Sequence, residues 1–217
     1  IRIEKLCDSG SAFSRTYPVT PLTVYSALDD WDGNGRQSVW CSSRYYRVNI
    51  YCDGRDVLIR DLHLFDETCR DPYLNRPCRE KSAVYETLPV MDGLQFGDNV
   101  VQAGFVLGQG RIRWTKRDGE QFLLALEADG RELIMTVTEK NIKLKSEEDF
   151  SVSVRWSAEC KDIIKTDRNT IHYCHGGVSY CLKLEAGRLE MGTENSGKII
   201  SDDGQTGWMM YREEIDS

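Results

Sequence analysis

Short stretches in which apolar and polar residues alternate recur along the chain and predict β-strands. Within residues 46–51, Tyr46, Val48 and Ile50 fall on one face and the intervening residues fall on the other. An Asp-Gly pair at 53–54 follows, and a second apolar run begins at Val57. Because an Asp-Gly pair between two such runs favours a two-residue turn, this segment predicts a β-hairpin.

The pattern becomes more regular in the second half of the chain. Further strands are predicted at 111–116, 121–127, 132–138, 150–156, 171–174 and 178–184. Asp-Gly or Gly-Gly pairs separate several of them, which is typical of a meander. By contrast, residues 8–21 are polar and contain two prolines, which predicts an extended connection. No segment shows the pattern of a three-turn amphipathic helix.

These elements predict an all-β protein, namely an antiparallel, jelly-roll-like β-sandwich. About a dozen short strands at this spacing favour a sandwich or barrel, and the lack of a fixed-period repeat argues against a propeller. No linker divides the chain, so we expect one domain over 1–217, with a loop-rich part at 1–98 and a β-meander at 99–217.

Charge and hydropathy exclude two classes of partner. The formal net charge is −7, and the basic residues are scattered, which argues against nucleic acid or an anionic membrane as the main partner. No run approaches the roughly 18 apolar residues that a membrane span requires. The oligomeric state is not predicted by any of these features.

The eight cysteines favour an extracytoplasmic protein. Their number is even and none forms a Cys-x-x-Cys pair, so disulfides in an oxidising compartment are the economical interpretation. Cys69–Cys78 and Cys174–Cys181 are the best local pairs, and reduced, buried cysteines are the alternative. Together with the absence of an Asn-x-Ser/Thr sequon, this predicts a secreted, periplasmic or surface protein, with a bacterial origin favoured.

One loop carries the spacing of a calcium site. Asp30, Asp32 and Asn34 place side-chain oxygens at alternate positions, and Gly35 follows at once. This resembles the first half of the D-x-D-x-[DN]-G calcium loop of EF-hands and many extracellular calcium modules, and the resemblance implies the Arg36 carbonyl as a further ligand. The twelfth position is Cys41 rather than Glu, so the loop is not an EF-hand. We expect a structural calcium ion, with a polar turn as the alternative.

Aromatic residues follow this loop closely. Trp31 lies inside it, and Trp40, Tyr45 and Tyr46 come soon after. Exposed aromatic rings suit stacking on the apolar face of a sugar, so these four residues are the predicted ligand contacts. Half-buried strand aromatics are the alternative interpretation.

Two other groups were tested for chemistry. Asp61 and His63 share a face of an alternating strand, and Asp66 and Glu67 follow, so these four are the candidates for acid–base catalysis. No Gly-x-Ser-x-Gly motif accompanies them, and solvated strand residues are the alternative. His172 and His175 flank Cys174, but three residues apart on a strand they face opposite ways, so we interpret them as ordinary hairpin residues; a metal site at a tight turn is the alternative.

The hypothesis that combines these features is carbohydrate recognition by a calcium- and disulfide-stabilised β-sandwich, alone or as a module of a carbohydrate-active protein. A jelly-roll glycoside hydrolase or polysaccharide lyase is the first alternative. A protein-binding or adhesion module of the cell surface is the second. All three rest on an association between fold and function.

Overall fold

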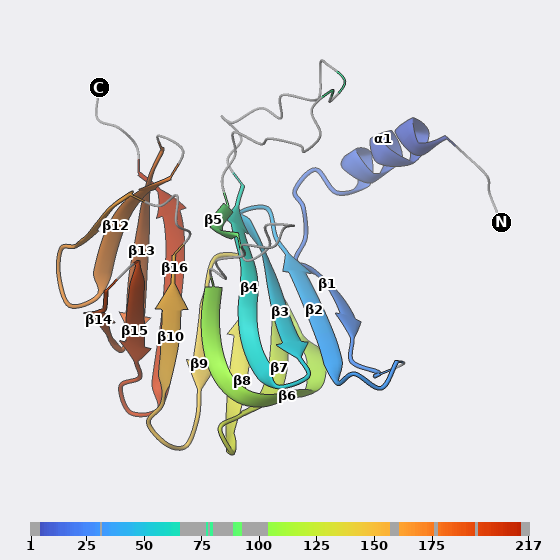
Figure 1. The fold of residues 1–217 in the computed structure, drawn as a ribbon. Helices are drawn as coiled ribbons and strands as arrows, with labels where there is room; N and C mark the ends of the chain where they lie inside the picture. The colour runs from blue at the N-terminus through green and yellow to red at the C-terminus, as the bar shows by residue number, and fades with distance from the viewer. Residues whose placement is uncertain are drawn as a thin grey trace.

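The computed structural model describes residues 5–30, 32–65, 77, 79, 89–92, 104–156, 161–175, 178–193 and 195–213. Strands make up most of this part of the chain, and they pair antiparallel into a sandwich of two sheets (Figure 1). The all-β, antiparallel sandwich predicted from the alternating pattern is therefore confirmed. Among the described residues, no helix is long and apolar enough to span a membrane.

The first sheet combines strands from both ends of the chain. Its order is β1-β2-β3-β4-β6-β10-β15-β14, with the short strand β5 also paired to β4. The bounds are β1 Thr23–Ala27, β2 Arg36–Ser42, β3 Tyr46–Asp53, β4 Asp56–Leu64, β5 Pro89–Asp92, β6 Gly104–Asp118, β10 Ser151–Arg155, β14 Arg188–Met191 and β15 Ser196–Ile200. The predicted hairpin at 46–59 corresponds to β3 and β4.

The second sheet contains the predicted meander and continues beyond it. Its order is β6-β7-β8-β9-β16-β13-β12-β11. The bounds are β7 Gln121–Ala128, β8 Arg131–Val137, β9 Ile142–Lys145, β11 Lys161–Lys165, β12 Thr170–His175, β13 Val178–Ala186 and β16 Gln205–Arg212. The order places β16 between β9 and β13, so the C-terminal strand completes the sheet in its middle.

Strand β6 belongs to both sheets and joins them. Its first half pairs with β4 and β10, and its second half pairs with β7. Between the halves the strand curves strongly (Figure 1). A Cβ atom on Gly110 would lie 1.8 Å from the Glu127 carbonyl oxygen, so only glycine allows β6 to approach β7 this closely at the junction.

The core fills the space between the two sheets. On β3, Tyr46, Val48 and Ile50 all point into it and are at most 3% exposed, as their alternation predicted. Across the interface the rings of Phe105 and Trp208 stack with centroids 4.7 Å apart. Aromatic contact of this kind adds specific geometry to the burial of apolar area.

One element differs from the sequence expectation. Residues 8–21 were predicted as an extended connection, but Leu6–Thr16 form the helix α1. None of its residues is buried, and it lies apart from the sheets (Figure 1). Asp8 in the first turn and Arg15 in the last turn complement the helix dipole. Three serines, a glycine and an aspartate make up nearly half of this helix, and residues of these types favour turns and loops, so the composition of the segment argued against a helix.

Candidate binding face of the first sheet

The side of the first sheet that faces away from the core carries a continuous row of side chains. In an antiparallel sheet, residues paired directly across strands project from the same face. The pairing runs across eight strands, through Ala27, Ser38, Tyr51, Leu58, Val106, Ser153, Lys198 and Glu190. We call this side of the sheet the outer face.

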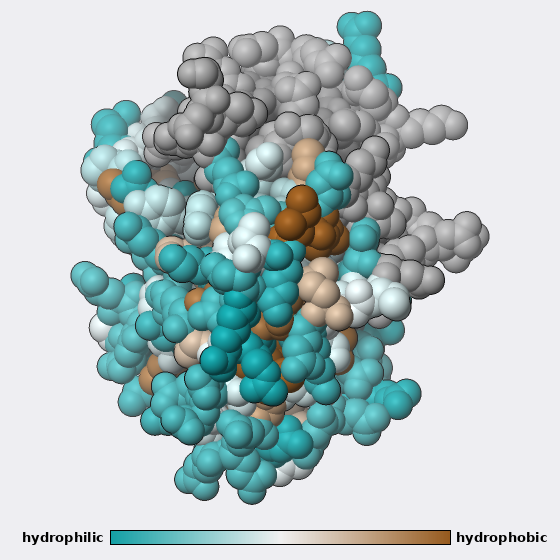
Figure 2. All heavy atoms as spheres, turned by 90° about the vertical axis from the view of Figure 1, so that its left-hand side faces the viewer, coloured by the Kyte–Doolittle hydropathy of each residue, from teal (hydrophilic) through white to brown (hydrophobic). Residues whose placement is uncertain are grey.

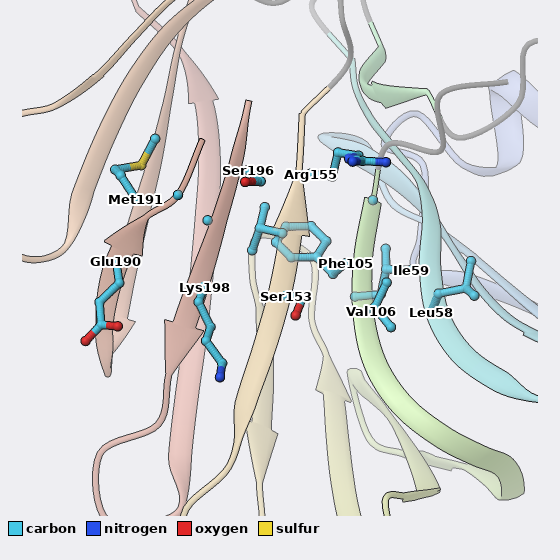
Figure 3. A pocket seen from close by; sticks show the side chains of 14 residues that line it. Leu58, Ile59, Phe105, Val106, Ser153, Arg155, Glu190, Met191, Ser196 and Lys198 are labelled. Carbon is cyan, nitrogen blue, oxygen red and sulfur yellow. The ribbon is translucent and has the colours of Figure 1, made fainter. Parts of the chain in front are cut away.

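A groove of about 590 Å³ lies on the outer face, over β4, β6, β10, β15 and β14. Leu58 and Val106 give it an apolar wall, and Val106 is 45% exposed. In Figure 3, Arg155 lies toward one end of the groove, and Lys198 and Glu190 lie toward the other. The groove therefore offers two cationic groups, one carboxylate and an apolar strip to a ligand.

The described surface beside the edges of the two sheets is mostly polar (Figure 2). Figure 2 shows the side of the molecule that carries the edges of both sheets, and its described surface is mainly hydrophilic. Hydrophobic atoms come to the surface there only in small areas between polar residues. Within the groove, the apolar strip of Leu58 and Val106 adjoins charged side chains, and this combination is typical of a ligand-binding site.

Aromatic residues extend the outer face toward its β1 edge. Trp40 pairs with Tyr25 across β1 and β2, and Tyr25 is 74% exposed. Tyr51 lies in the row itself, and the guanidinium of Arg60 stacks over its ring at 4.0 Å from the centroid. Sequence reasoning missed Tyr25 and Tyr51, although the alternation within 46–51 already placed Tyr51 opposite the core residues.

The four predicted ligand contacts do not come together on this face. Trp40 does lie on it, with the Arg47 guanidinium 5.8 Å from its ring centroid. Tyr45 packs against the core at the β2–β3 turn, and Lys140 and Arg44 lie over its ring. Tyr46 is 3% exposed and so does not stack on a ligand. Trp31 lies outside the described residues.

The predicted calcium ligands lie in the loop between β1 and β2. Asp30, Asp32 and Asn34 are exposed. Asn34 donates from its amide nitrogen to Asp32 at 2.5 Å, and its amide oxygen accepts from the Arg36 N–H at 2.9 Å. The loop is thus an Asx-type turn in which two of the predicted ligands already touch.

Two of the four candidates for acid–base catalysis lie on the outer face, on β4. Asp61 and His63 share it, opposite Asn49 and Arg47 on β3. The Arg47 Nε lies 3.0 Å from the Asp61 carboxylate. Burial, with a contribution from Arg47, lowers the pKa of His63 to about 4, so the imidazole is neutral at pH 7. Asp66 and Glu67 lie outside the described residues.

The described cysteines are free thiols. Cys174 and Cys181, predicted as a disulfide pair, are both unbonded: Cys174 lies opposite Ser179 and Cys181 lies opposite His172. Cys7, Cys41 and Cys52 are also free. Cys69 and Cys78, the other predicted pair, lie outside the described residues.

One group of described side chains has a donor set and spacing suited to a metal ion, and it lies on the second sheet. His172, Cys181 and Glu213 place one ligand atom each within 4.8 Å of one another. Asp30 and Asp32 are not part of any such group of His, Cys, Asp or Glu among the described residues. Sequence reasoning named His172, assigned Cys181 to a disulfide and missed Glu213; Cys181 lies on β13 and Glu213 directly follows β16.

Comparisons with known proteins add a structural likeness. No family model and no curated protein matches the chain. Among solved structures, the chain is similar to one described as an active YidC insertase crystal structure with the first transmembrane domain resolved, at a TM-score of 0.45 and 10% identity. The match covers 95% of this chain and 44% of that chain.

Proposed function

We propose that this protein is an extracytoplasmic binding module that recognises a carbohydrate on the outer face of its first sheet. The observation that carries the proposal is the row of paired side chains across that face. At one end this row runs into the groove. At the other end, on β1 and β2, the Tyr25–Trp40 pair lies beside the row. Because Tyr25 and Val106 are exposed at well-separated positions along this face, it suits an extended polymer better than a small enclosed ligand.

The chemistry of the face matches the two sides of a sugar. The apolar face of a pyranose ring stacks on aromatic side chains, for which Trp40 and Tyr25 are placed. Sugar hydroxyls need hydrogen-bonding partners, and Ser153, Lys198 and Glu190 line the groove. Because Arg155 and Lys198 outnumber Glu190, the groove favours a glycan that carries carboxylate or sulfate groups.

Glycan-array screening followed by calorimetry with the best ligand tests this proposal. We expect Trp40→Ala and Lys198→Glu each to weaken binding about tenfold or more, roughly the loss of one good contact. Trp114→Ala is the matched control, because Trp114 is 42% exposed but lies on the second-sheet half of β6. Thermal melts of each variant confirm that it is folded.

Two outcomes would overturn the proposal. One is that no glycan binds, and the other is that all three variants bind the glycan equally. If a protein partner bound instead, and Lys198→Glu blocked it, the module would belong to the adhesion class. Release of reducing sugar, lost in His63→Gln, would identify a glycan-degrading enzyme.

Calcium in the Asp30–Arg36 loop is a separate part of the proposal. Asp32 and Asn34 are adjacent, and rotation of the Asn34 amide would turn its oxygen toward the same centre. With calorimetry on EDTA-treated protein, we expect saturable Ca²⁺ binding that Asp32→Asn weakens at least tenfold. Asp53→Asn is the control, because Asp53 makes a similar turn through Arg55 and Asp56. If Asp32→Asn gave the same binding heats with Ca²⁺ as the parent protein, Asp32 would not be a calcium ligand and the loop would be an ordinary polar turn.

A further inference from the structure

The second sheet carries a cluster of polar side chains that the carbohydrate proposal does not use. His172 on β12, Cys181 on β13 and Tyr211 on β16 are paired in one row across three adjacent strands. Glu213 follows β16, and its N–H donates to the Ser179 carbonyl, which continues the ladder by one step. The alternate residues Tyr173, Tyr180 and Leu182 are buried in the core, so this row lies on the sheet's other side.

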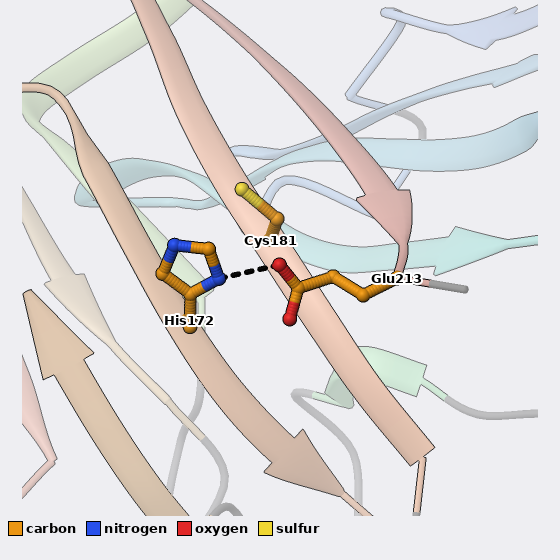
Figure 4. A group of neighbouring side chains, drawn as sticks. All are labelled: His172, Cys181 and Glu213. Carbon is orange, nitrogen blue, oxygen red and sulfur yellow. Dashed lines mark hydrogen bonds and ion pairs between the residues drawn. The ribbon is translucent and has the colours of Figure 1, made fainter. Parts of the chain in front are cut away.

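In Figure 4 the His172 ring and the Glu213 carboxylate face each other, and the Cys181 side chain lies beside them on the strand between. The His172 Nδ1 lies 2.5 Å from a Glu213 carboxylate oxygen, and the Cys181 Sγ lies within 4.8 Å of both ligand groups. Adjacent ligands of a tetrahedral zinc ion are about 3–4 Å apart, given metal–ligand distances of about 2.0–2.3 Å. Small side-chain rotations would therefore bring all three atoms onto one ion.

The groups around the cluster already hold these donors in place. The other imidazole nitrogen, Nε2, lies 3.1 Å from the Thr166 hydroxyl. If Nδ1 holds a metal, Nε2 carries the proton and donates it to Thr166, which is the usual support of a metal-bound histidine. Tyr211 is paired with Cys181 across β13 and β16, so its side chain flanks the thiol on the side away from His172.

Exposure and donor type indicate the class of ion. Cys181 is fully buried, whereas the side chains of His172 and Glu213 are 33% and 31% exposed, so solvent reaches the site from one side. Calcium and magnesium prefer shells made only of oxygen. A mixed nitrogen, sulfur and oxygen set suits zinc and related divalent transition metals, and three protein ligands leave a fourth position for water.

We propose that His172, Cys181 and Glu213 form a binding site for a divalent transition-metal ion of the zinc class. The ion lies between Nδ1 of His172 and the Glu213 carboxylate and binds Cys181 as a thiolate. The proton held between the imidazole and the carboxylate and the proton of the thiol are both released to solvent. It ties the end of β16 to β12 through β13. The site is independent of the outer face of the first sheet and of the predicted calcium loop.

The test uses the full chain, stripped with EDTA and kept reduced with a phosphine. Calorimetry with Zn²⁺ should show one site, and Co²⁺ should give a thiolate-to-metal charge-transfer absorption together with tetrahedral visible bands. Cys181→Ser should abolish the charge-transfer absorption, and Glu213→Gln should weaken Zn²⁺ binding about 10- to 100-fold. Zn²⁺ should also raise the melting temperature of the parent protein and not that of Cys181→Ser.

Cys174→Ser is the matched control. Cys174 is a free thiol on the same side of β12, two residues from His172, but outside the cluster. It should bind Zn²⁺ and Co²⁺ as the parent protein does. Since Cys181→Ser alters a buried position, Glu213→Gln, at a partly exposed one, keeps the test decisive if Cys181→Ser fails to fold.

Three results would overturn the inference. The first is no saturable Zn²⁺ binding by the parent protein. The second is Co²⁺ binding without the charge-transfer absorption, which would mean that the thiol is not a ligand. The third is equal Zn²⁺ affinity in the parent protein and in Glu213→Gln, which would leave His172 and Glu213 as an ordinary ion pair.

Discussion

Tyr46 shows how a single side chain ties the two sheets together. Its ring lies in the core on the first sheet, and its hydroxyl donates to the Thr138 carbonyl at 2.7 Å and lies 3.1 Å from that of Asn141. Both carbonyls belong to the β8–β9 connection of the second sheet. Because a buried hydroxyl needs a partner, this contact fixes the relative position of the sheets at that end.

We expect Tyr46→Phe to lower the free energy of unfolding by about 1–2 kcal/mol, because it removes the hydroxyl that donates to the partly buried Thr138 carbonyl. Urea unfolding measures the change. Tyr25→Phe, at an exposed position, should leave the stability within about 0.5 kcal/mol of the parent value. Equal stability of Tyr46→Phe and the parent protein would show that the hydroxyl contributes nothing to sheet packing.

His63 makes the stability depend on pH. The pKa of His63 is lowered to about 4 in the folded protein, first by burial and then by Arg47, whereas an unfolded histidine titrates near 6.5. Between these values the unfolded chain binds a proton that the folded chain does not. Stability from this residue is therefore complete above about pH 6.5 and is lost as the pH falls toward 4.

We expect the parent protein to lose on the order of 2 kcal/mol more than His63→Gln between pH 7 and pH 4.5, since glutamine has no such proton to bind. Urea unfolding at both pH values measures the difference between the two proteins. Parallel pH profiles would mean that His63 is solvated in the folded state and titrates normally.

At the scale of elements, the double role of β6 depends on its glycines. Gly104 and Gly108 both have a φ of +137°, which other residues rarely adopt, and Gly110 has no room for a Cβ beside the Glu127 carbonyl. These positions let one strand leave the first sheet and enter the second. The junction is thus set by backbone geometry rather than by side-chain packing.

Gly110→Ala should lower the free energy of unfolding by at least about 2 kcal/mol, because the added methyl meets backbone that cannot move away easily. Gly10→Ala is the control with the opposite sign. Gly10 lies in α1 with nothing within 4 Å of an added Cβ, so alanine should stabilise the helix by about 0.5–1 kcal/mol. Thermal melts and urea titrations measure both, and a Gly110→Ala protein as stable as the parent would contradict the close approach.

For the whole molecule, the shared strand and the shared core predict that both sheets unfold together. The Phe105–Trp208 contact and the Tyr46 hydrogen bond cross the interface. Trp40 lies in β2 and Trp156 directly follows β10, both in the first sheet, whereas Trp114 and Trp208 lie in strands of the second sheet. Tryptophan fluorescence therefore reports on both.

We expect urea unfolding followed by fluorescence and by far-UV circular dichroism to give coincident, single transitions. A Trp40→Phe variant should show the same midpoint by both probes, which controls for one tryptophan dominating the signal. Two separated transitions would divide the chain into independently folding units and contradict the single domain expected from the sequence.

The sequence predicted correctly which side chains of a strand face the core, because this depends only on alternation along that strand. The alternation in β3 placed Tyr46 with Val48 and Ile50, and all three are core residues. The same pattern should have excluded Tyr46 from the predicted ligand contacts, because one side chain cannot serve both faces. The Asp-Gly pairs at 53–54, 118–119 and 129–130 all mark turns between paired strands.

Candidate sites were harder to predict, because they depend on which strands become neighbours. Lys198 and Glu190 meet Leu58 and Val106 only through the order β4-β6-β10-β15-β14. In the same way, Cys181 and Glu213 reach His172 only because β16 and β12 flank β13. The helix α1 was missed because its serines, glycine and aspartate are residues that favour turns and loops.

The sequence by itself determined the strand class, the turns and the residues of the core, because side-chain alternation and turn chemistry are local. The tertiary structure alone decided the order of the strands, the junction at β6, the groove and the His172–Cys181–Glu213 cluster. These features arise from pairings between residues far apart in the chain. Strands pair through backbone hydrogen bonds, and every residue except proline carries the same backbone donor and acceptor. The local sequence therefore does not specify which strands become neighbours.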